Sequence, residues 1–140
     1  MVGFMYRSGD GVLKNHQTAV TWYTLAAKQG LVEAQSTLGV MYGNGDGVLE
    51  NDKTAVKWYT LAAEQGNARA QNNLGVMYSN GNGIFIDYIR AYMWYNIATY
   101  NGHKLAGANK GKMAKKLTPT QRTKAQEMSS TCLASDYKDC

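Results

Sequence analysis

A stretch of 26 residues recurs three times in the first 102 residues of this 140-residue chain. Residues 5–30, 41–66 and 77–102 align without a gap, and each copy begins 36 residues after the one before it. A period of this length is typical of helical repeat proteins, in which each unit buries its apolar face only by stacking on its neighbours. The period therefore predicts a solenoid, and it constrains the fold more tightly than the composition does.

The first half of each repeat is predicted to be a helix. In the middle copy, Ala34 and Leu38 share one face of a helix over residues 33–42. Gly39 lies on that face, and Gly75 takes the same position 36 residues later. Glycine inside a helix costs about 1 kcal/mol relative to alanine. We expect this cost to be offset, because glycine lets a neighbouring helix approach closely.

The second half of each repeat is predicted to be a helix that follows an N-cap at Asn51 and ends at Gly66. The glycines between positions 43 and 47 form the turn before it, since glycine readily adopts positive φ. The buried face is expected to carry small and aromatic side chains, namely Ala55, Trp58, Tyr59, Ala62 and Ala63. The equivalent residues in the other copies are Asn15 and Asp87 for the cap, and Trp22 and Trp94 for Trp58.

The recurring residues resemble the pattern of the Sel1-like repeat family, which is similar to tetratricopeptide repeats but slightly longer. The pattern is A-x-x-x-L-G-x-x-Y-x-x-G-x-G-V followed by D/N-x-x-x-A-x-x-W-Y-x-x-A-A-x-x-G, and it covers residues 1–102. In the middle copy it comprises Ala34, Leu38, Gly39, Tyr42, Gly45, Gly47, Val48, Asn51, Ala55, Trp58, Tyr59, Ala62, Ala63 and Gly66. The resemblance implies an all-α fold, a right-handed α–α superhelix (solenoid) of helix-turn-helix repeats that serves as a protein-interaction scaffold.

The whole chain is predicted to form one solenoid domain. Residues 1–30 are a partial first repeat, 31–66 the second and 67–102 the third. Residues 103–140 leave the pattern, and we expect a degenerate first helix of a fourth repeat, then a C-terminal capping helix and a tail. A capping box at Thr118-Pro119-Thr120-Gln121 marks the start of that last helix. The N-terminal end shows no comparable polar layer, which suggests a truncated chain or self-association through that end.

The outward arc of the first helix of each repeat carries the candidate binding residues. An apolar side chain recurs there at Phe4, Val40 and Val76, each 36 residues apart. The polar residues that flank this row are Glu33, Ser36 and Thr37 in the second repeat and Arg69, Asn72 and Asn73 in the third. On the concave face of a solenoid such a row suits a bound peptide of a protein partner. The alternative is that the row packs against the next helix and belongs to the core.

No group of residues recommends a metal site, a cofactor or an enzyme active site. His16 and His103 are isolated, and the Gly-x-Gly pairs repeat with the fold, so we interpret them as turns rather than phosphate loops. Ser135 and Lys138 match S-x-x-K, and some relatives of the family have been linked to penicillin binding, but the chain has no K-T-G. We predict a non-catalytic scaffold. The alternative is a hydrolase or binder acting on β-lactam or cell-wall material.

The net charge of +5 lies entirely in the last quarter of the chain. Residues 1–102 hold seven basic and seven acidic side chains, whereas residues 103–140 hold eight basic and three acidic ones. A solvated pair of terminal helices explains this excess. Besides the scaffold and the hydrolase or binder of cell-wall material, a third possible function is that Lys104 to Lys124 bind nucleic acid or an anionic surface.

The two cysteines, Cys132 and Cys140, lie close together near the C-terminus. A tail that folds back from a helix ending near Cys132 would bring them within bonding reach, and we expect a disulfide. A disulfide would favour a periplasmic or secreted protein, whereas two reduced thiols would favour a cytoplasmic one. The chain has no run of about 18 apolar residues, so the sequence predicts no membrane-spanning helix.

Overall fold

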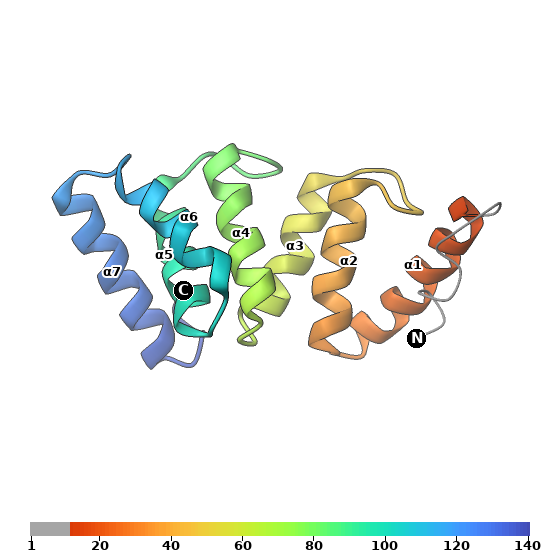
Figure 1. The fold of residues 1–140 in the computed structure, drawn as a ribbon. Helices are drawn as coiled ribbons and strands as arrows, with labels where there is room; N and C mark the ends of the chain where they lie inside the picture. The colour runs from red at the N-terminus through yellow and green to blue at the C-terminus, as the bar shows by residue number, and fades with distance from the viewer. Residues whose placement is uncertain (1–11) are drawn as a thin grey trace.

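Helices that are stacked side by side make up the part of the chain described by the computed structural model, residues 12–140. Their bounds are Val12–Lys28 (α1), Val32–Asn44 (α2), Asp52–Ala63 (α3), Ala68–Asn80 (α4), Tyr88–Tyr100 (α5), Lys104–Ala114 (α6) and Pro119–Ala134 (α7). Figure 1 shows them following one another along the long axis of the molecule. The described chain is an all-α solenoid, as the repeat predicts.

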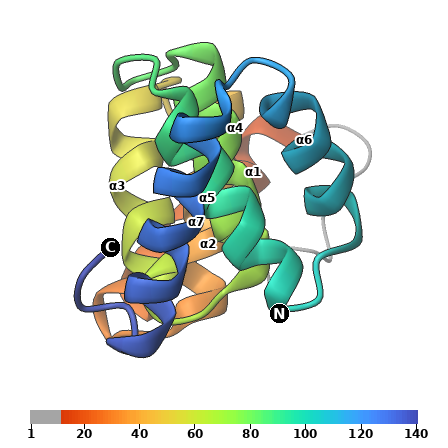
Figure 2. The ribbon, with the colours of Figure 1, turned by 90° about the vertical axis from the view of Figure 1, so that its left-hand side faces the viewer.

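Each repeat contributes one helix to either side of the stack. The first helices of the repeats are α2, α4 and α6, here called the A helices, and the second helices are α1, α3 and α5, here called the B helices. Each B helix packs against the A helix before it in the chain, where one is described, and against the A helix that follows. Successive A helices also touch one another. Figure 2 shows α3 and α6 on opposite sides of the molecule. We call the surface formed by α2, α4 and α6 the A face.

The predicted ends of α3 and α5 are confirmed, whereas α2 continues through Gly43 to Asn44, two residues beyond its predicted end. The side chain of Asn51 accepts a hydrogen bond from the amide of Thr54 at 3.0 Å, and Asp87 does the same for Arg90 at 3.0 Å. Gly66 lies in the turn that follows α3 and has a φ of 90°, in the left-handed region that favours glycine. The prediction for Asn15 is wrong, because α1 begins at Val12 and Asn15 lies inside it.

The glycines inside α2 and α4 are explained by a tyrosine ring. A Cβ atom built on Gly39 would lie 2.6 Å from Cδ1 of Tyr59, and one built on Gly75 would lie 2.7 Å from Cδ1 of Tyr95. Both distances are too short for a real side chain, so the B helix can approach the A helix this closely only where glycine is present. The expected close approach is confirmed, and the same contact repeats after 36 residues.

A buried glutamine joins each repeat to the one before it. Gln35 donates from Nε2 to the carbonyl of Ala27 at 3.2 Å, and its Oε1 accepts a hydrogen bond from Gln65 at 2.8 Å. In the next repeat Gln71 donates to the carbonyl of Ala63 at 3.0 Å and accepts from Asn101 at 2.9 Å. Both amides are thus satisfied although they are almost fully buried.

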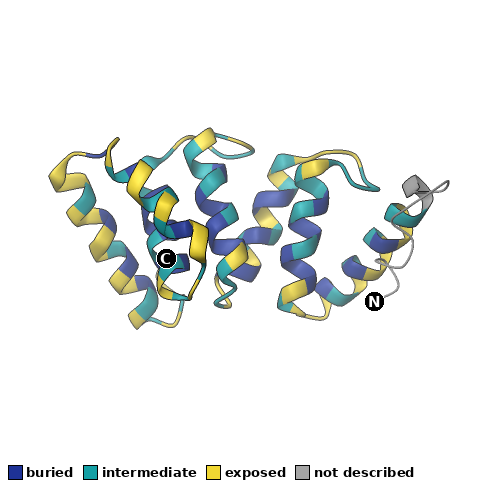
Figure 3. Cartoon of the chain, viewed as in Figure 1, coloured by how far each residue is buried: buried dark blue, intermediate teal, exposed yellow. Residues whose placement is uncertain are grey.

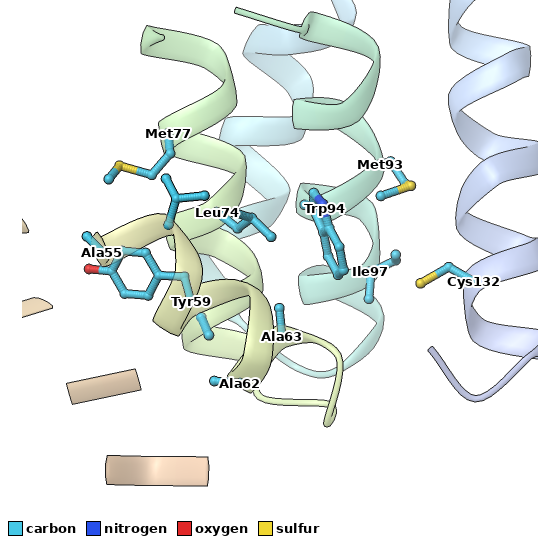
Figure 4. Close-up of a cluster of buried hydrophobic side chains, with 12 residues drawn as sticks. Ala55, Tyr59, Ala62, Ala63, Leu74, Met77, Met93, Trp94, Ile97 and Cys132 are labelled. Carbon is cyan, nitrogen blue, oxygen red and sulfur yellow. The ribbon is translucent and has the colours of Figure 1, made fainter. Parts of the chain in front are cut away.

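The repeated tryptophan is not buried equally in the three B helices. Trp94 is 3% exposed, Trp58 is half-buried and Trp22 is 56% exposed. The expectation that all three belong to a buried face is therefore wrong for Trp22. Trp94 lies in a buried cluster with Ala63 from α3 and Leu74 from α4, a cluster that also contains Ile97 and Cys132 (Figure 4). In the described chain no helix covers α1 in the way that α7 covers α5, and Figure 3 shows exposed residues along α1.

The C-terminal helix packs against α5. Its predicted capping box is confirmed, because Thr118 Oγ1 accepts from the amide of Gln121 at 3.1 Å and Gln121 Oε1 accepts from the amide of Thr118 at 2.9 Å. A disulfide joins Cys132 to Cys140, with their Cα atoms 4.5 Å apart. The tail between them turns back so that the hydroxyl of Tyr137 accepts a hydrogen bond from Asn101 at 3.0 Å.

Candidate functional site

The predicted apolar row lies partly inside the stack. Val40 is half-buried against a core cluster that includes Tyr59, and Val76 is half-buried against one that includes Tyr95. Phe4 lies outside the described residues. Val40 and Val76 therefore contribute to packing between repeats, and Val76 also borders two hollows on the A face, described below.

The predicted polar residues link successive A helices. Nε of Arg69 donates to the hydroxyl of Ser36 at 3.2 Å, and its Nη2 donates to that of Thr37 at 3.1 Å. Asn109 donates to the side chain of Asn72 at 3.0 Å.

Burial separates these polar residues into two groups. Ser36 is 0% exposed and Asn72 is 7% exposed, so these two side chains connect helices instead of facing solvent. Glu33 is exposed and accepts a hydrogen bond from Asn67 at 2.9 Å. Thr37 and Asn73 are partly exposed, and Arg69 is exposed. The outward surface of the A face therefore carries Glu33, Thr37, Arg69 and Asn73.

Two hollows lie on the A face, one between α2 and α4 and the other between α4 and α6. The α2–α4 hollow has a volume of about 200 Å³ and is lined by Gly43, Asn44, Asp52, Tyr59, Asn73, Val76, Met77 and Asn82. The α4–α6 hollow has a volume of about 320 Å³ and is lined by Val76, Ser79, Asn80, Tyr95, Asn109, Lys112, Met113 and Lys116.

The two hollows are copies of one another. Six lining residues of the first recur 36 positions later in the second, and the pairs are Gly43 and Ser79, Asn44 and Asn80, Tyr59 and Tyr95, Asn73 and Asn109, Val76 and Lys112, and Met77 and Met113. The repeat that builds the stack therefore also builds a row of similar recesses, each with a tyrosine hydroxyl, a methionine and an equivalent pair of asparagine side chains.

The tyrosines in these hollows stay protonated well above neutral pH. Burial raises the pKa of Tyr59 to about 12, while the charge of Arg69 and a hydrogen bond with Asn73 partly oppose the increase. Burial also raises the pKa of Tyr95, and a hydrogen bond with Ser79 opposes it. Each hollow thus offers an uncharged hydroxyl that can donate or accept a hydrogen bond.

Sequence reasoning had identified Val76 and Asn73 but missed most residues of the hollows. The sequence predicts Tyr59 only as a core residue. In the structure its ring packs on Gly39, and its hydroxyl also reaches the recess. The signal was the recurrence of Asn44 at Asn80 and of Asn73 at Asn109. A polar residue that recurs with the repeat period but lies outside the core pattern indicates a position with the same surroundings in each repeat, such as a recess between two A helices.

The residues considered for catalysis or metal binding have structural roles or stand alone. The hydroxyl of Ser135 donates to the carbonyl of Cys132 at 3.0 Å and accepts from the amide of Asp139 at 2.9 Å, while Lys138 is exposed. His103 occupies the N-cap position of α6, and His16 lies within α1. Among the described residues no group of histidine, cysteine or acidic side chains could hold a metal ion. In the same part of the chain, no helix has the length and apolar character needed to cross a membrane.

The repeats match a known family along most of the chain. Residues 1–31, 32–67 and 68–103 each match the model of the Sel1 repeat. The chain belongs to the Sel1 repeat family. Proteins with Sel1 repeats are generally protein–protein interaction scaffolds. None of the curated proteins matches the chain.

Two solved Sel1 repeat structures show the same fold. One is a protective antigen present in uropathogenic Escherichia coli strains that displays an SLR fold, with 34% sequence identity and a TM-score of 0.87 over 96% of this chain. The other is a Sel1 repeat protein from Oxalobacter formigenes, with 41% identity and a TM-score of 0.70 over 79% of this chain. The chain spans 30% of the length of the first protein and 45% of the second.

Proposed function

We propose that this Sel1 repeat protein is a non-catalytic scaffold that binds an extended peptide segment of a protein partner along the A face. The polar residues that the sequence predicts for a concave binding face lie on α2 and α4 of this surface. The observation that carries the proposal is the pair of equivalent hollows, because a row of similar recesses suits a chain whose side chains enter them at regular intervals.

The spacing of the hollows fits such a chain. Packed helices lie about 8–10 Å apart. A polyproline II segment rises about 3.1 Å per residue and brings every third side chain to the same side, about 9 Å further on. Side chains three residues apart can therefore enter the α2–α4 and α4–α6 hollows in turn. Asn44, Asn73, Asn80 and Asn109 line these hollows with amides that can bond to a peptide backbone as donors and acceptors.

Substitutions at the rim of the hollows test this proposal. Asn44 and Asn80 are exposed, end their helices and hold equivalent positions, so Asn44→Trp with Asn80→Trp would obstruct both hollows without disturbing the core. Peptides would be selected from a random heptapeptide library on the wild-type protein, and their affinities measured by fluorescence anisotropy. We expect the double variant to lose binding while its helicity, followed by circular dichroism, stays unchanged.

The matched control places the same side chains on the other side of the stack. Thr21 and Lys57 are exposed on α1 and α3 and are also 36 residues apart. Thr21→Trp with Lys57→Trp should leave peptide binding intact. A selection without specific binders, or binders equally affected by both double variants, would show that the A face is not the binding surface.

A further inference from the structure

The two hollows share six equivalent lining positions but differ in charge. The α2–α4 hollow contains Asp52, and Val76 occupies the position that Lys112 takes in the α4–α6 hollow. The residue 36 positions after Asp52 is Tyr88, and the Nζ atom of Lys116 lies 4.9 Å from the centroid of that ring. From one repeat to the next, a recess with one carboxylate becomes a recess with two ammonium groups.

The two lysines of the α4–α6 hollow have no carboxylate beside them in this part of the fold. Neither α4 nor α6 contains an acidic residue. In the part of the chain that the structure describes, the ion pair within 4 Å joins Arg90 to Asp87, and neither residue lines the hollow. Lys112 and Lys116 are exposed, so a bound anion could reach both without leaving a buried charge uncompensated.

We infer that the α4–α6 hollow receives an aspartate or glutamate side chain of the bound peptide. The inference rests on the proposed function and adds the chemistry of the partner, an acidic linear segment. The carboxylate would lie between Lys112 and Lys116, with the side chains of Ser79 and Asn80 nearby as hydrogen-bond donors. The residue three positions away in the peptide enters the α2–α4 hollow.

The carboxylate of Asp52 in the α2–α4 hollow disfavours a nucleic acid as the ligand of the A face. A phosphate backbone that followed the A face would carry its negative charge from Lys112 and Lys116 past the carboxylate of Asp52, about one helix spacing away. Like charges at that distance oppose binding. An isolated carboxylate on a peptide meets no such repulsion. Val76 and Met113 also give the recess an apolar wall that suits the methylene groups of an acidic side chain.

Charge reversal at the two lysines tests the inference. Heptapeptides selected on the wild-type protein should be enriched in aspartate or glutamate at a fixed position. Changing that residue to asparagine or glutamine in the peptide should weaken binding about tenfold to a hundredfold, the range for a charged hydrogen-bonded contact. Lys112→Glu with Lys116→Glu should weaken the acidic peptide similarly or more and leave its amide version nearly unaffected.

A second pair of lysine substitutions separates the effect of the hollow from the effect of net charge. Lys115→Glu with Lys124→Glu changes the net charge by the same amount at exposed positions outside the hollow, and it should leave the acidic peptide bound. Circular dichroism checks that all variants fold. Peptides without an acidic preference that are still displaced by Asn44→Trp with Asn80→Trp would overturn the inference but retain the A face as the binding surface.

Two further outcomes also decide the matter. Binding of a 20-base-pair DNA duplex that depends on Lys112 and Lys116, without acidic peptides in the selection, would assign the hollow to phosphate and overturn the inference. If the Lys112/Lys116 and Lys115/Lys124 variants lost the same amount of affinity for the acidic peptide, the effect would be one of net charge alone, and the inference would be overturned as well.

Discussion

Helices α1 and α5 hold the same position in their repeats, yet their outer surfaces differ. Trp22 and Leu25 on α1 are 56% and 52% exposed, whereas the equivalent Trp94 and Ile97 on α5 are 3% and 0% exposed. Trp94 and Ile97 lie in a buried cluster formed with side chains of α3 and α4 and with Cys132 of α7, whereas Trp22 belongs to the first described helix and no described helix precedes it. A consensus tryptophan in a repeat therefore specifies a surface for stacking, and whether it is buried depends on what stacks there.

The largest expected effect separates the two tryptophans directly. Trp94→Ala removes a fully packed side chain and should reduce the free energy of unfolding by about 3–5 kcal/mol. Trp22→Ala removes a side chain that is more than half exposed, and we expect a loss of about 1 kcal/mol or less. Urea unfolding followed by circular dichroism measures both. Similar losses for the two variants would show that α1 is covered as well as α5 is.

A smaller effect concerns the disulfide that holds the tail beneath α7. Cys140→Ser removes the bond and leaves the buried Cys132 in place. The chain-entropy model gives about 2–3 kcal/mol for a loop of this length. We expect the variant to lose stability by up to that amount, and a reductant to destabilise the wild type but not the variant. Two thiols titrating in the native protein without reductant would contradict the bond.

The smallest expected effect compares two glycines at equivalent positions in A helices. Gly75→Ala places a methyl group against the ring of Tyr95, and overpacking of this kind costs about 1–3 kcal/mol. Apart from its chain neighbours and the backbone of its own helix, no described atom lies within 4 Å of a Cβ built on Gly111, so Gly111→Ala should stabilise α6 by about 0.5–1 kcal/mol. Thermal unfolding of the two variants should therefore shift in opposite directions. Shifts of the same sign would mean that the ring yields to the added methyl group.

The stack itself followed from the sequence because its determinants are local and repeated. The helix ends at Asn51, Asp87 and Gly66, the capping box at Thr118 and the interior glycines all act within one repeat or against its own neighbour. The N-caps, the C-terminal glycines and the interior glycines recur after 36 residues, and the capping box is a recognisable local pattern, so each of them can be predicted from the sequence alone.

The candidate site was less predictable because it depends on residues from different repeats. A helical wheel gives the side on which Ser36 lies, but it does not show that Arg69 of the next repeat bonds to its hydroxyl. The hollows likewise form between two A helices, and the tyrosine that lines each one enters from a B helix. Similarly, the pattern of α7 predicted a capping helix but not that α5 is the helix it covers.

The buried glutamines give the stack cooperativity. Gln35 and Gln71 each bond to a carbonyl at the end of the preceding repeat and to a side chain at the end of their own, so one residue fixes both the turn before it and the turn after it. If one repeat were to open alone, a buried amide and a backbone carbonyl would lose their partners at the boundary, at a cost of about 1–3 kcal/mol each. We therefore expect neighbouring repeats to unfold together in one cooperative transition. A partly unfolded state with a boundary between an ordered and a disordered repeat would leave these buried polar groups without partners.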